Sequence, residues 1–256
     1  MFKNAIVRAP GENFAEGLTT VDLGIPQYEK AIEQHARYCE ALQACGLEIS
    51  ELEADLRHAD STFVEDTAVL TERGAVLTRP GAASRKGEVA AMRGTIRRFF
   101  SEVVEIEAPG TLDGGDICEA EDRFYIGLSK RTNEEGARQL SRFLRDWGYV
   151  ATVVDIRRIN SILHLKSGVC YAGDNTMVVM EEMAELPFWS GYELIRVPVE
   201  ESYAANCVRV NERVLVAGGY PRVEAGLRER GFRPLVLDMS EFRKMDGGLS
   251  CLSLRF

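Results

Sequence analysis

The end of the chain carries a cysteine whose setting suits a nucleophile. Cys251 follows two glycines, Gly247 and Gly248, and precedes a short apolar segment, 252–256. Glycines permit tight turns and a close approach of the backbone, so this thiol can face a pocket instead of filling a core. A free thiol has a pKa of about 8.5 and is only slightly ionised at neutral pH. A nucleophilic role therefore needs a neighbouring cation that favours the thiolate.

Of the three histidines, His164 is the best candidate for a general acid and base. His35 lies on the apolar face of a helical pattern and His58 lies in a loop-like segment, whereas His164 stands at the start of a strand-like segment. Histidine changes its protonation near neutral pH, which is what an acid–base group requires. A histidine that is hydrogen-bonded for structural reasons is the alternative, and the pattern alone leaves both open.

Carboxylates gather at equivalent places near other apolar segments. Glu65 and Asp66 interrupt the apolar run that begins at Phe63, and Asp113 and Asp116 flank a glycine pair. Carboxylates are rarely buried unless they pair with, or bind, a positive group. Adjacent strand residues face opposite sides. Glu65 and Asp66 therefore enter one site together only where the strand opens, and one of them can be structural.

Arginines beside the same segments complete a pattern of charges. Arg79, Arg85 and Arg131 can each present a fork of donors to a carboxylate, although most arginines are simply surface residues. Carboxylates, Asp60 among them, together with arginines in one cleft suit a zwitterionic ligand that carries an additional cation. An amino acid with a guanidinium tail fits this description.

A loose internal repeat explains how such distant residues can meet. Each copy consists of a hairpin with a polar turn, then a helix and a further strand, and copies begin near Phe63, Asp116, Gly168 and Cys207. Repeats of roughly 40–50 residues are typical of propellers and other repeat folds. The fifth copy is divided between the C-terminal segment and residues 2–8. We therefore expect a closed ring of five units, with the starts of the strands gathered at its centre.

Helix signals separate the strands. A helix is predicted from about Pro26 to Cys45, because its apolar residues recur at spacings of three and four. Thr132 and Glu135 fit a capping box. Pro221 suits a first helical turn, and Gly231 suits the end of that helix. The third copy shows a weaker helical pattern.

The composition limits the class of protein. The chain has 256 residues, of which 45% are hydrophobic, and no linker divides it. This is enough for a large core, and we take residues 1–256 as a single domain. A net charge of −9 disfavours nucleic acid as a partner. No run of about 18 apolar residues occurs and no secretory signal is visible, so we expect neither a membrane span nor export.

The cysteines give no sign of a disulfide framework or a metal site. All six lie within helix-like or strand-like patterns, and the chain contains no C-x-x-C pair and no H-x-x-x-H pair. We interpret them as reduced thiols of a cytoplasmic protein without a bound metal.

The motifs, taken together, resemble those of the dimethylarginine dimethylaminohydrolases, within the guanidine-modifying superfamily of amidinotransferase-like proteins. The resemblance covers essentially the whole chain, and its strength lies in the number of motifs that occur in the family's order. They are Phe63–Asp66, Thr78–Gly81 with Ser84 and Arg85, Thr111–Asp116, Gly127–Asn133, Leu163–Ser167, Ala204–Cys207 and the ending from Asp246 to Cys251.

The resemblance implies an α/β fold, a five-bladed αβ propeller with pseudo-fivefold symmetry and a central funnel. It also implies hydrolysis of Nω-methylated arginine to citrulline and methylamine or dimethylamine, with no cofactor. The implied ligand is thus a small guanidino amino acid, and neither nucleic acid nor a membrane is an implied partner. A homodimer is the assembly that we consider.

Residue roles carry over by position as part of the same resemblance. Cys251 is similar to the nucleophile, His164 to the general acid and base, and Asp113 to the carboxylate that holds the guanidinium and orients the histidine. Family members have Glu or Asp at position 113, and Asp is shorter by about one bond. The substrate-binding set comprises Asp66 as second guanidinium carboxylate, Glu65 as a further site residue, Arg85 and Arg131 as α-carboxylate clamp, Asp60, and the backbones of Leu18 and Met245. Leu18 would lie on a mobile lid, 17–20.

Three alternatives are weighed against this interpretation. An arginine deiminase uses the same nucleophilic steps and expels ammonia. An amidinotransferase passes the amidine to an incoming amine, and the short chain argues against it because few insertions remain to exclude water. A non-catalytic amino-acid-binding protein of the same fold is the third, and the presence of Cys251, His164 and Asp113 argues against that.

Overall fold

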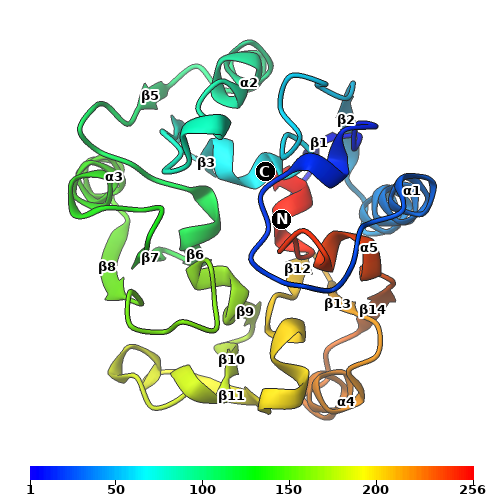
Figure 1. Cartoon of the computed structure of the whole chain (residues 1–256). Helices are drawn as coiled ribbons and strands as arrows, with labels where there is room; N and C mark the ends of the chain where they lie inside the picture. The colour runs from blue at the N-terminus through cyan, green and yellow to red at the C-terminus, as the bar shows by residue number, and fades with distance from the viewer.

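Five three-stranded sheets form a closed ring in the computed structural model, which describes residues 1–256 (Figure 1). In each sheet, or blade, the first two strands pair antiparallel and the third lies parallel to the second. Four blades are made of β3 (Ala68–Thr71), β4 (Gly74–Leu77) and β5 (Val103–Glu105); β6 (Ile117–Ala120), β7 (Arg123–Leu128) and β8 (Val150–Asp155); β9 (Val169–Gly173), β10 (Thr176–Met180) and β11 (Glu193–Val197); and β12 (Val208–Val210), β13 (Arg213–Ala217) and β14 (Pro234–Leu237). The repeat predicted from the sequence is thus confirmed.

The fifth blade joins the two ends of the chain. It consists of β15 (Ser253–Arg255), β1 (Asn4–Arg8) and β2 (Glu48–Leu52). β15 pairs antiparallel with β1, so that Ala5 lies opposite Arg255. Both termini therefore lie within the ring, as Figure 1 shows. This pairing confirms the predicted division of the fifth copy, and it places the segment that follows Cys251 beside the first strand of the chain.

Helices connect the second and third strands on the rim of the ring (Figure 1). A parallel pair needs a crossover connection, and a helix is the usual one. The connections contain α1 (Tyr28–Ala44), α2 (Glu88–Ile96), α3 (Glu134–Asp146) and α4 (Pro221–Glu229), and a short α5 (Ser240–Arg243) follows β14. The β9–β11 blade has only two single-turn 3₁₀ helices, Glu181–Met183 and Pro187–Trp189, in line with its weak helical pattern.

One predicted helix cap was wrong. The side chain of Asn133, not Thr132, accepts a hydrogen bond from the backbone N–H of Gly136 and caps α3. The hydroxyl of Thr132 instead donates to the buried carboxylate of Asp116, at 2.6 Å. A buried carboxylate without hydrogen bonds costs more free energy than an uncapped helix end. The Thr132 hydroxyl therefore binds Asp116 and does not cap the helix.

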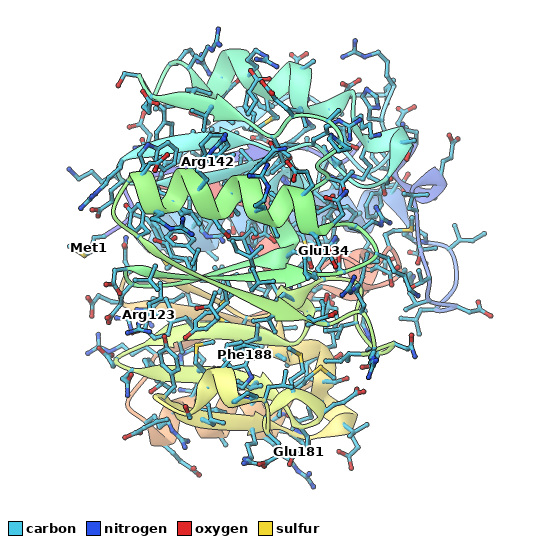
Figure 2. All side chains as sticks on the ribbon, turned by 90° about the vertical axis from the view of Figure 1, so that its left-hand side faces the viewer. Met1, Arg123, Glu134, Arg142, Glu181 and Phe188 are labelled. Atoms are coloured by element: carbon cyan, nitrogen blue, oxygen red, sulfur yellow. The ribbon has the colours of Figure 1, made fainter.

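Apolar packing between the blades and under the helices makes the ring rigid. The largest cluster holds 25 buried residues, Trp189 and Val216 among them, and runs from β6 to α4. Beneath α3, Leu140 and Leu144 are completely buried against the β6–β8 blade. Figure 2 shows this side of the ring, with α3 lying across its blade between Glu134 and the region of Arg142. The packing fixes the inner ends of the strands, where the charged residues meet.

No helix combines the length and the apolarity that a bilayer crossing requires. All six cysteines are free thiols.

Leu140→Ala tests how far helix packing stabilises the ring. Leu140 is completely buried in α3, so its truncation should leave a cavity and lower the free energy of unfolding by about 2–5 kcal/mol. Urea unfolding followed by circular dichroism measures the change. Arg142→Ala on the exposed side of the same helix is the matched control and should cost about 1 kcal/mol or less. Equal losses in the two variants would contradict the packing argument.

Candidate active site

Five short 3₁₀ segments, four of about one turn and one of seven residues, lead into the first strands of the five blades and carry the polar residues of the ring centre. Glu65 and Asp66 lie in the 3₁₀ turn Val64–Thr67, and Cys251 lies in the turn Ser250–Leu252. Asp113 immediately precedes the turn Gly114–Asp116, and His164 immediately precedes the turn Leu165–Ser167. Asn206 directly follows the 3₁₀ segment Val199–Ala205. Pseudo-fivefold symmetry therefore brings residues that are far apart in sequence to equivalent places. The sequence indicated strand starts, but not that each start is a 3₁₀ turn.

His164 and Asp113 form a buried pair. The Nε2 atom of His164 lies 3.0 Å from Oδ2 of Asp113, whose side chain is fully buried. The other carboxylate oxygen of Asp113 accepts the backbone N–H of Gly81 at 2.8 Å. Burial by itself would lower the pKa of His164, but the carboxylates of Asp66, Asp116 and Asp113 outweigh it and raise the pKa to about 9. His164 is therefore an oriented imidazolium at neutral pH.

Asp66 is a buried anion at the same centre. Its carboxylate forms an ion pair with Nη1 of Arg85 and accepts the backbone N–H of Gly115 at 2.8 Å. Burial would raise the pKa of Asp66, but the charges of Arg85 and His164, together with these hydrogen bonds, lower it to about 2. The carboxylate stays negative throughout the physiological range.

Cys251 is a neutral thiol in this arrangement. Burial raises its pKa to about 12, and the carboxylates of Glu65 and Asp66 contribute in the same direction. Its Sγ accepts the backbone N–H of Gly248 at 3.4 Å, a contact that favours the thiolate but does not offset burial. Without a further cation, the proportion of thiolate at neutral pH is very small.

A small cavity joins these groups. Its volume is about 30 Å³, room for one or two waters, since a water needs roughly 10–15 Å³ of such space. Eight of the ten predicted site residues line it, namely Leu18, Asp60, Asp66, Arg85, Arg131, His164, Met245 and Cys251. Phe63, Leu163, Asp246 and Gly247 line it as well and were not among the predicted set. Their only sequence signal was their place in the motifs Phe63–Asp66, Leu163–Ser167 and Asp246–Cys251.

Two predicted residues lie behind the cavity wall. Asp113 is fully buried and does not line the cavity, but its carboxylate lies 3.0 Å from His164 and 3.8 Å from Arg131, which both do. Glu65 accepts a hydrogen bond from the hydroxyl of Ser250 at 2.7 Å and forms an ion pair with Lys166, so its carboxylate is already engaged by the protein. The geometry thus gives Asp113 an orienting contact with His164, and it places Glu65 in the wall behind Cys251.

The two arginines of the predicted clamp differ in their surroundings. Arg85 is buried, and its guanidinium donates to Glu88, to Asp66 and to the backbone carbonyls of Phe63 and Asp60. Arg131 is half-buried, and its guanidinium makes no hydrogen bond with the protein; its nearest carboxylate oxygen, on Asp113, is 3.8 Å away. Arg131 is therefore the freer donor for an incoming carboxylate.

A short segment, 17–20, contributes Leu18 to the edge of the cavity. The backbone N–H of Leu18 donates to both carboxylate oxygens of Asp60, at 3.0 and 3.3 Å. The N–H of Thr20 donates to Asp246 at 2.6 Å, and the hydroxyl of Thr19 donates to the carbonyl of Lys244 at 2.9 Å. An arginine-sized ligand does not fit in a cavity of 30 Å³, so the lining must widen to admit one.

Asp66, Asp113 and His164 also lie close enough to one another to hold a metal ion. The charges account for this proximity without one. The protonated His164 is surrounded by carboxylates. Asp66 accepts a hydrogen bond from the backbone N–H of Gly115 and forms an ion pair with Arg85, and Asp113 accepts a hydrogen bond from the backbone N–H of Gly81.

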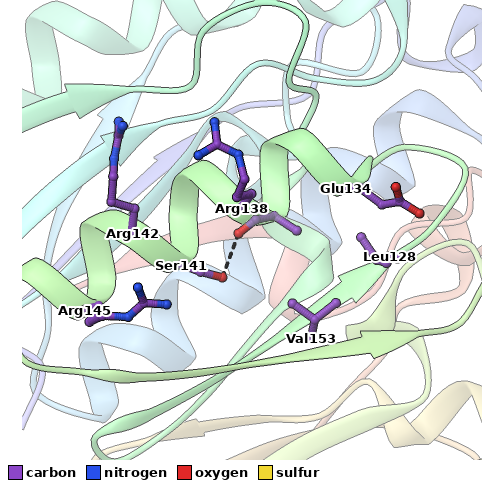
Figure 3. A pocket seen from close by; sticks show the side chains of 8 residues that line it. Leu128, Glu134, Arg138, Ser141, Arg142, Arg145 and Val153 are labelled. Atoms are coloured by element: carbon purple, nitrogen blue, oxygen red, sulfur yellow. Dashed lines mark hydrogen bonds between the residues drawn. The ribbon is translucent and has the colours of Figure 1, made fainter.

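A larger groove lies elsewhere, between α3 and β8 (Figure 3). Its volume is about 480 Å³, and it is lined by Leu128, Glu134, Ala137, Arg138, Ser141, Arg142, Arg145 and Val153. The Ser141 hydroxyl donates to the backbone carbonyl of Ala137 at 2.7 Å and has no histidine beside it. Arg138 is paired with Glu135. The groove is lined by neither a cysteine nor a histidine, whereas the smaller cavity contains both.

Comparison with known proteins gives the relationships of the chain. The family model described as arginine deiminase matches residues 58–196. The N(G),N(G)-dimethylarginine dimethylaminohydrolase of Pseudomonas aeruginosa is 48% identical over the whole of both chains, and that of Streptomyces coelicolor is 36% identical over 99% of this chain and 96% of its own.

Solved structures agree with these relationships. One crystal structure is that of a dimethylarginine dimethylaminohydrolase as an adduct with S-methyl-L-thiocitrulline, and another is that of a cysteine-to-serine mutant of the Pseudomonas aeruginosa protein complexed with citrulline. Each superposes over the full length of both chains with a TM-score of 0.97 at 46% identity. The N-terminal domain of ArgZ, an arginine dihydrolase of cyanobacteria, shares the fold, with a TM-score of 0.83 at 18% identity over 100% of this chain and 98% of that one. The five-bladed αβ propeller, its ring of charged turns and the full-length identity lead to one conclusion: the chain belongs to the dimethylarginine dimethylaminohydrolase family.

Proposed function

We propose that the protein hydrolyses Nω-methylated arginine, both asymmetric dimethylarginine and monomethylarginine, to citrulline and dimethylamine or methylamine. The observation that carries the proposal is the juxtaposition of a neutral thiol, a permanent carboxylate and an imidazolium in one small cavity. Cys251, Asp66 and His164 supply these three groups. A guanidinium is the ligand that satisfies the carboxylate and activates the thiol at once.

The substrate cation completes the charge balance of the site. Asp66 would hold the planar guanidinium beside Cys251, and the added positive charge would lower the pKa of the thiol. The thiol proton leaves to solvent, and the thiolate attacks the central guanidinium carbon. Substrate binding and nucleophile activation are thus one event, which protects an idle enzyme from unwanted thiol chemistry.

His164 would then act twice. As an imidazolium it donates a proton to the departing amine, because an amidine nitrogen is a poor leaving group without one. The C–N bond breaks and leaves a covalent thiouronium on Cys251. The neutral imidazole next takes a proton from water as the water attacks the same carbon. The C–S bond breaks, citrulline is released, and Cys251 regains its proton. Asp113 keeps the imidazole in position for both steps.

The walls of the cavity favour a methylated leaving group. Phe63, Leu163 and Met245 place apolar side chains around the charged centre, and apolar surface accepts methyl groups better than it accepts the bare N–H donors of arginine. Arginine deiminase activity is the second candidate, since the family model of that description covers residues 58–196.

One assay separates the candidates. The protein is incubated with arginine, monomethylarginine, asymmetric dimethylarginine and agmatine, and citrulline or carbamoylputrescine is followed together with the released amine. Turnover of the methylated substrates with release of methylamine or dimethylamine supports the proposal. Release of ammonia from arginine as the dominant reaction would establish the deiminase, and no turnover of any substrate would refute both.

We extend the proposal to the molecule as a whole. Residues 1–256 would act as one catalytic domain, which is supported by a cavity whose lining extends from Leu18 to Cys251. A cytoplasmic location fits six free thiols. The homodimer stays a prediction, and sedimentation measures it directly.

Cys251→Ser should abolish turnover and leave the fold intact. A serine hydroxyl is not ionised by a neighbouring guanidinium, so kcat should fall by roughly 10³-fold or more. Citrulline formation measures activity, and the urea unfolding midpoint serves as the control. Substantial activity in this variant would show that another group attacks the substrate.

Arg131→Ala should separate substrates that carry an α-carboxylate from those that lack one. Loss of a charge-assisted contact of about 1.5–3 kcal/mol should raise KM for methylarginine by roughly 10- to 100-fold. KM for agmatine, which has no carboxylate, should change little. Arg85→Ala is the informative comparison, because Arg85 also balances Asp66 and Glu88 and its loss should lower stability as well. Equal effects of Arg131→Ala on both substrates would contradict the clamp.

Asp113→Asn should lower kcat sharply and shift the pH profile. In the wild type, His164 is protonated below about pH 9, so kcat/KM should fall as pH rises through that value and the general acid is lost. Removal of a carboxylate that stabilises the imidazolium lowers its pKa, and the alkaline limb should move to lower pH by about one unit. An unchanged limb and a near-normal rate would assign the orienting role to Asp66 or Asp116.

A further inference from the structure

Asn206 uses every polar atom of its side chain at the ring centre. It lies directly after the turn Val199–Ala205 and is 7% exposed, and it does not line the cavity. Its Oδ1 accepts the backbone N–H of Ser250 at 3.0 Å. Its Nδ2 donates to the hydroxyl of Ser250 at 3.1 Å and to the backbone carbonyl of Lys166 at 3.0 Å. A buried amide with all of these contacts satisfied is held in one orientation.

These contacts join the two turns that carry the reactive groups. Ser250 immediately precedes Cys251, and Lys166 follows His164 by two residues within the next 3₁₀ turn. The three turns belong to different blades. Asn206 therefore connects the segment of the nucleophile to the segment of the acid–base group from a third side of the ring.

A closed circuit of hydrogen bonds reinforces this connection. The Ser250 hydroxyl accepts from Asn206 and donates to Glu65 at 2.7 Å. Glu65 in turn forms an ion pair with Nζ of Lys166, whose carbonyl accepts from Asn206. The charges of Glu65 and Lys166 offset each other, so the circuit carries no uncompensated buried charge. It explains why Glu65 is buried beside the site without lining the cavity.

The amide also packs against the residue that contacts the sulfur. A Cβ on Gly248 would lie 2.5 Å from Cγ of Asn206, so only glycine fits there. The N–H of Gly248 donates to Sγ of Cys251 at 3.4 Å. Any shift of Asn206 would thus reach the sulfur both through Ser250 and through Gly248.

We infer that Asn206 is a positioning residue that fixes Cys251 relative to His164. The inference rests on the proposed function, because it concerns the same two reacting groups. Reacting atoms must be held to a fraction of an ångström, and a misplacement of about 1 Å can cost roughly 10²-fold in rate. Only an amide offers the acceptor and the donors that this place requires. Alanine loses all three hydrogen bonds, and aspartate keeps the acceptor but loses the donors.

The chain provides a matched control in Asn211. Its Nδ2 donates to the carbonyls of Phe2 and Cys45 at 3.0 and 2.9 Å, and its Oδ1 accepts the N–H of Phe2 at 2.8 Å. It also makes three hydrogen bonds between blades, but it lies away from the cavity. Asn211→Ala should lower stability without a specific effect on catalysis.

The first experiment compares Asn206→Ala, Asn206→Asp and Asn211→Ala with the wild type. Steady-state kinetics with asymmetric dimethylarginine should show that kcat falls by roughly 10- to 10²-fold in Asn206→Ala and less in Asn206→Asp, with KM within about twofold because Asn206 does not touch the substrate. Asn211→Ala should keep kcat near the wild-type value. If Asn206→Ala does not fold, Asn206→Asp still decides. Values of kcat in the Asn206 variants equal to that of Asn211→Ala would overturn the inference.

The second experiment does not depend on turnover. Iodoacetamide labels the folded proteins at pH 8, and mass spectrometry of the peptide that contains Cys251 gives the rate at that thiol. A loosened turn exposes the sulfur and lessens the burial that raises its pKa, so labelling should be several-fold faster in both Asn206 variants and unchanged in Asn211→Ala. Equal labelling in all proteins would contradict positioning. If the wild type labels more slowly than both Asn206 variants but releases no citrulline, the proposed function alone is refuted.

Discussion

Charge balance in a buried space is the constraint on which the rest of this structure depends. The ring centre gathers Asp66, Asp113 and Asp116, all buried, against one imidazolium and one deeply buried arginine. Such groups are costly to remove from water unless each has a partner of opposite charge and good hydrogen bonds. The 3₁₀ turns meet this need, because their backbone N–H groups point at the carboxylates. Gly115 serves Asp66, Gly81 serves Asp113 from a neighbouring loop, and Leu165 serves Asp116. The fivefold ring is the framework that holds these pairings in place.

The same balance leaves one group poised for activation. Cys251 sits near Glu65 and Asp66, and its thiol stays neutral because burial and two carboxylates all oppose the thiolate. His164, with its raised pKa, already carries its proton and cannot take the one from sulfur. In the proposed mechanism a cation must therefore enter before the thiolate forms. The small volume of the cavity adds a second condition, since its lining must widen to admit the ligand. Thiol chemistry in the idle protein is thus restrained both by electrostatics and by access.

The sequence predicted most of this fold because the blade is a local pattern. Strand alternation, polar turns and the spacing of copies all lie within about 50 residues, and even the divided fifth blade followed from counting them. The partner of a side chain is a different matter. Thr132 was predicted to cap a helix and bonds to Asp116 instead. Arg85 lines the cavity as predicted, but its ion pairs with Asp66 and Glu88 were not foreseen. Hydrogen-bond partners depend on contacts between blades, and no local pattern encodes them. Phe63 and Leu163 belong to motifs noted in the sequence, but they were not predicted to line the cavity, because apolar residues are typical of a core.

The two arginines show how the fold divides roles that composition cannot separate. Both line the cavity, but Arg85 is enclosed by two carboxylates and two backbone carbonyls, whereas the guanidinium of Arg131 is free of hydrogen bonds with the protein. A substrate carboxylate that approached Arg85 would have to compete with Asp66 and Glu88 for the same donors. At Arg131 it would meet an unshared cation near the surface, where desolvation is cheaper. If Arg85 does contact the substrate, it does so while it still holds Asp66, and this would couple recognition of the carboxylate end to the anion that receives the guanidinium. In the proposed function, Arg131 would therefore be the first anchor of the carboxylate, and Arg85 would link the two ends of the ligand.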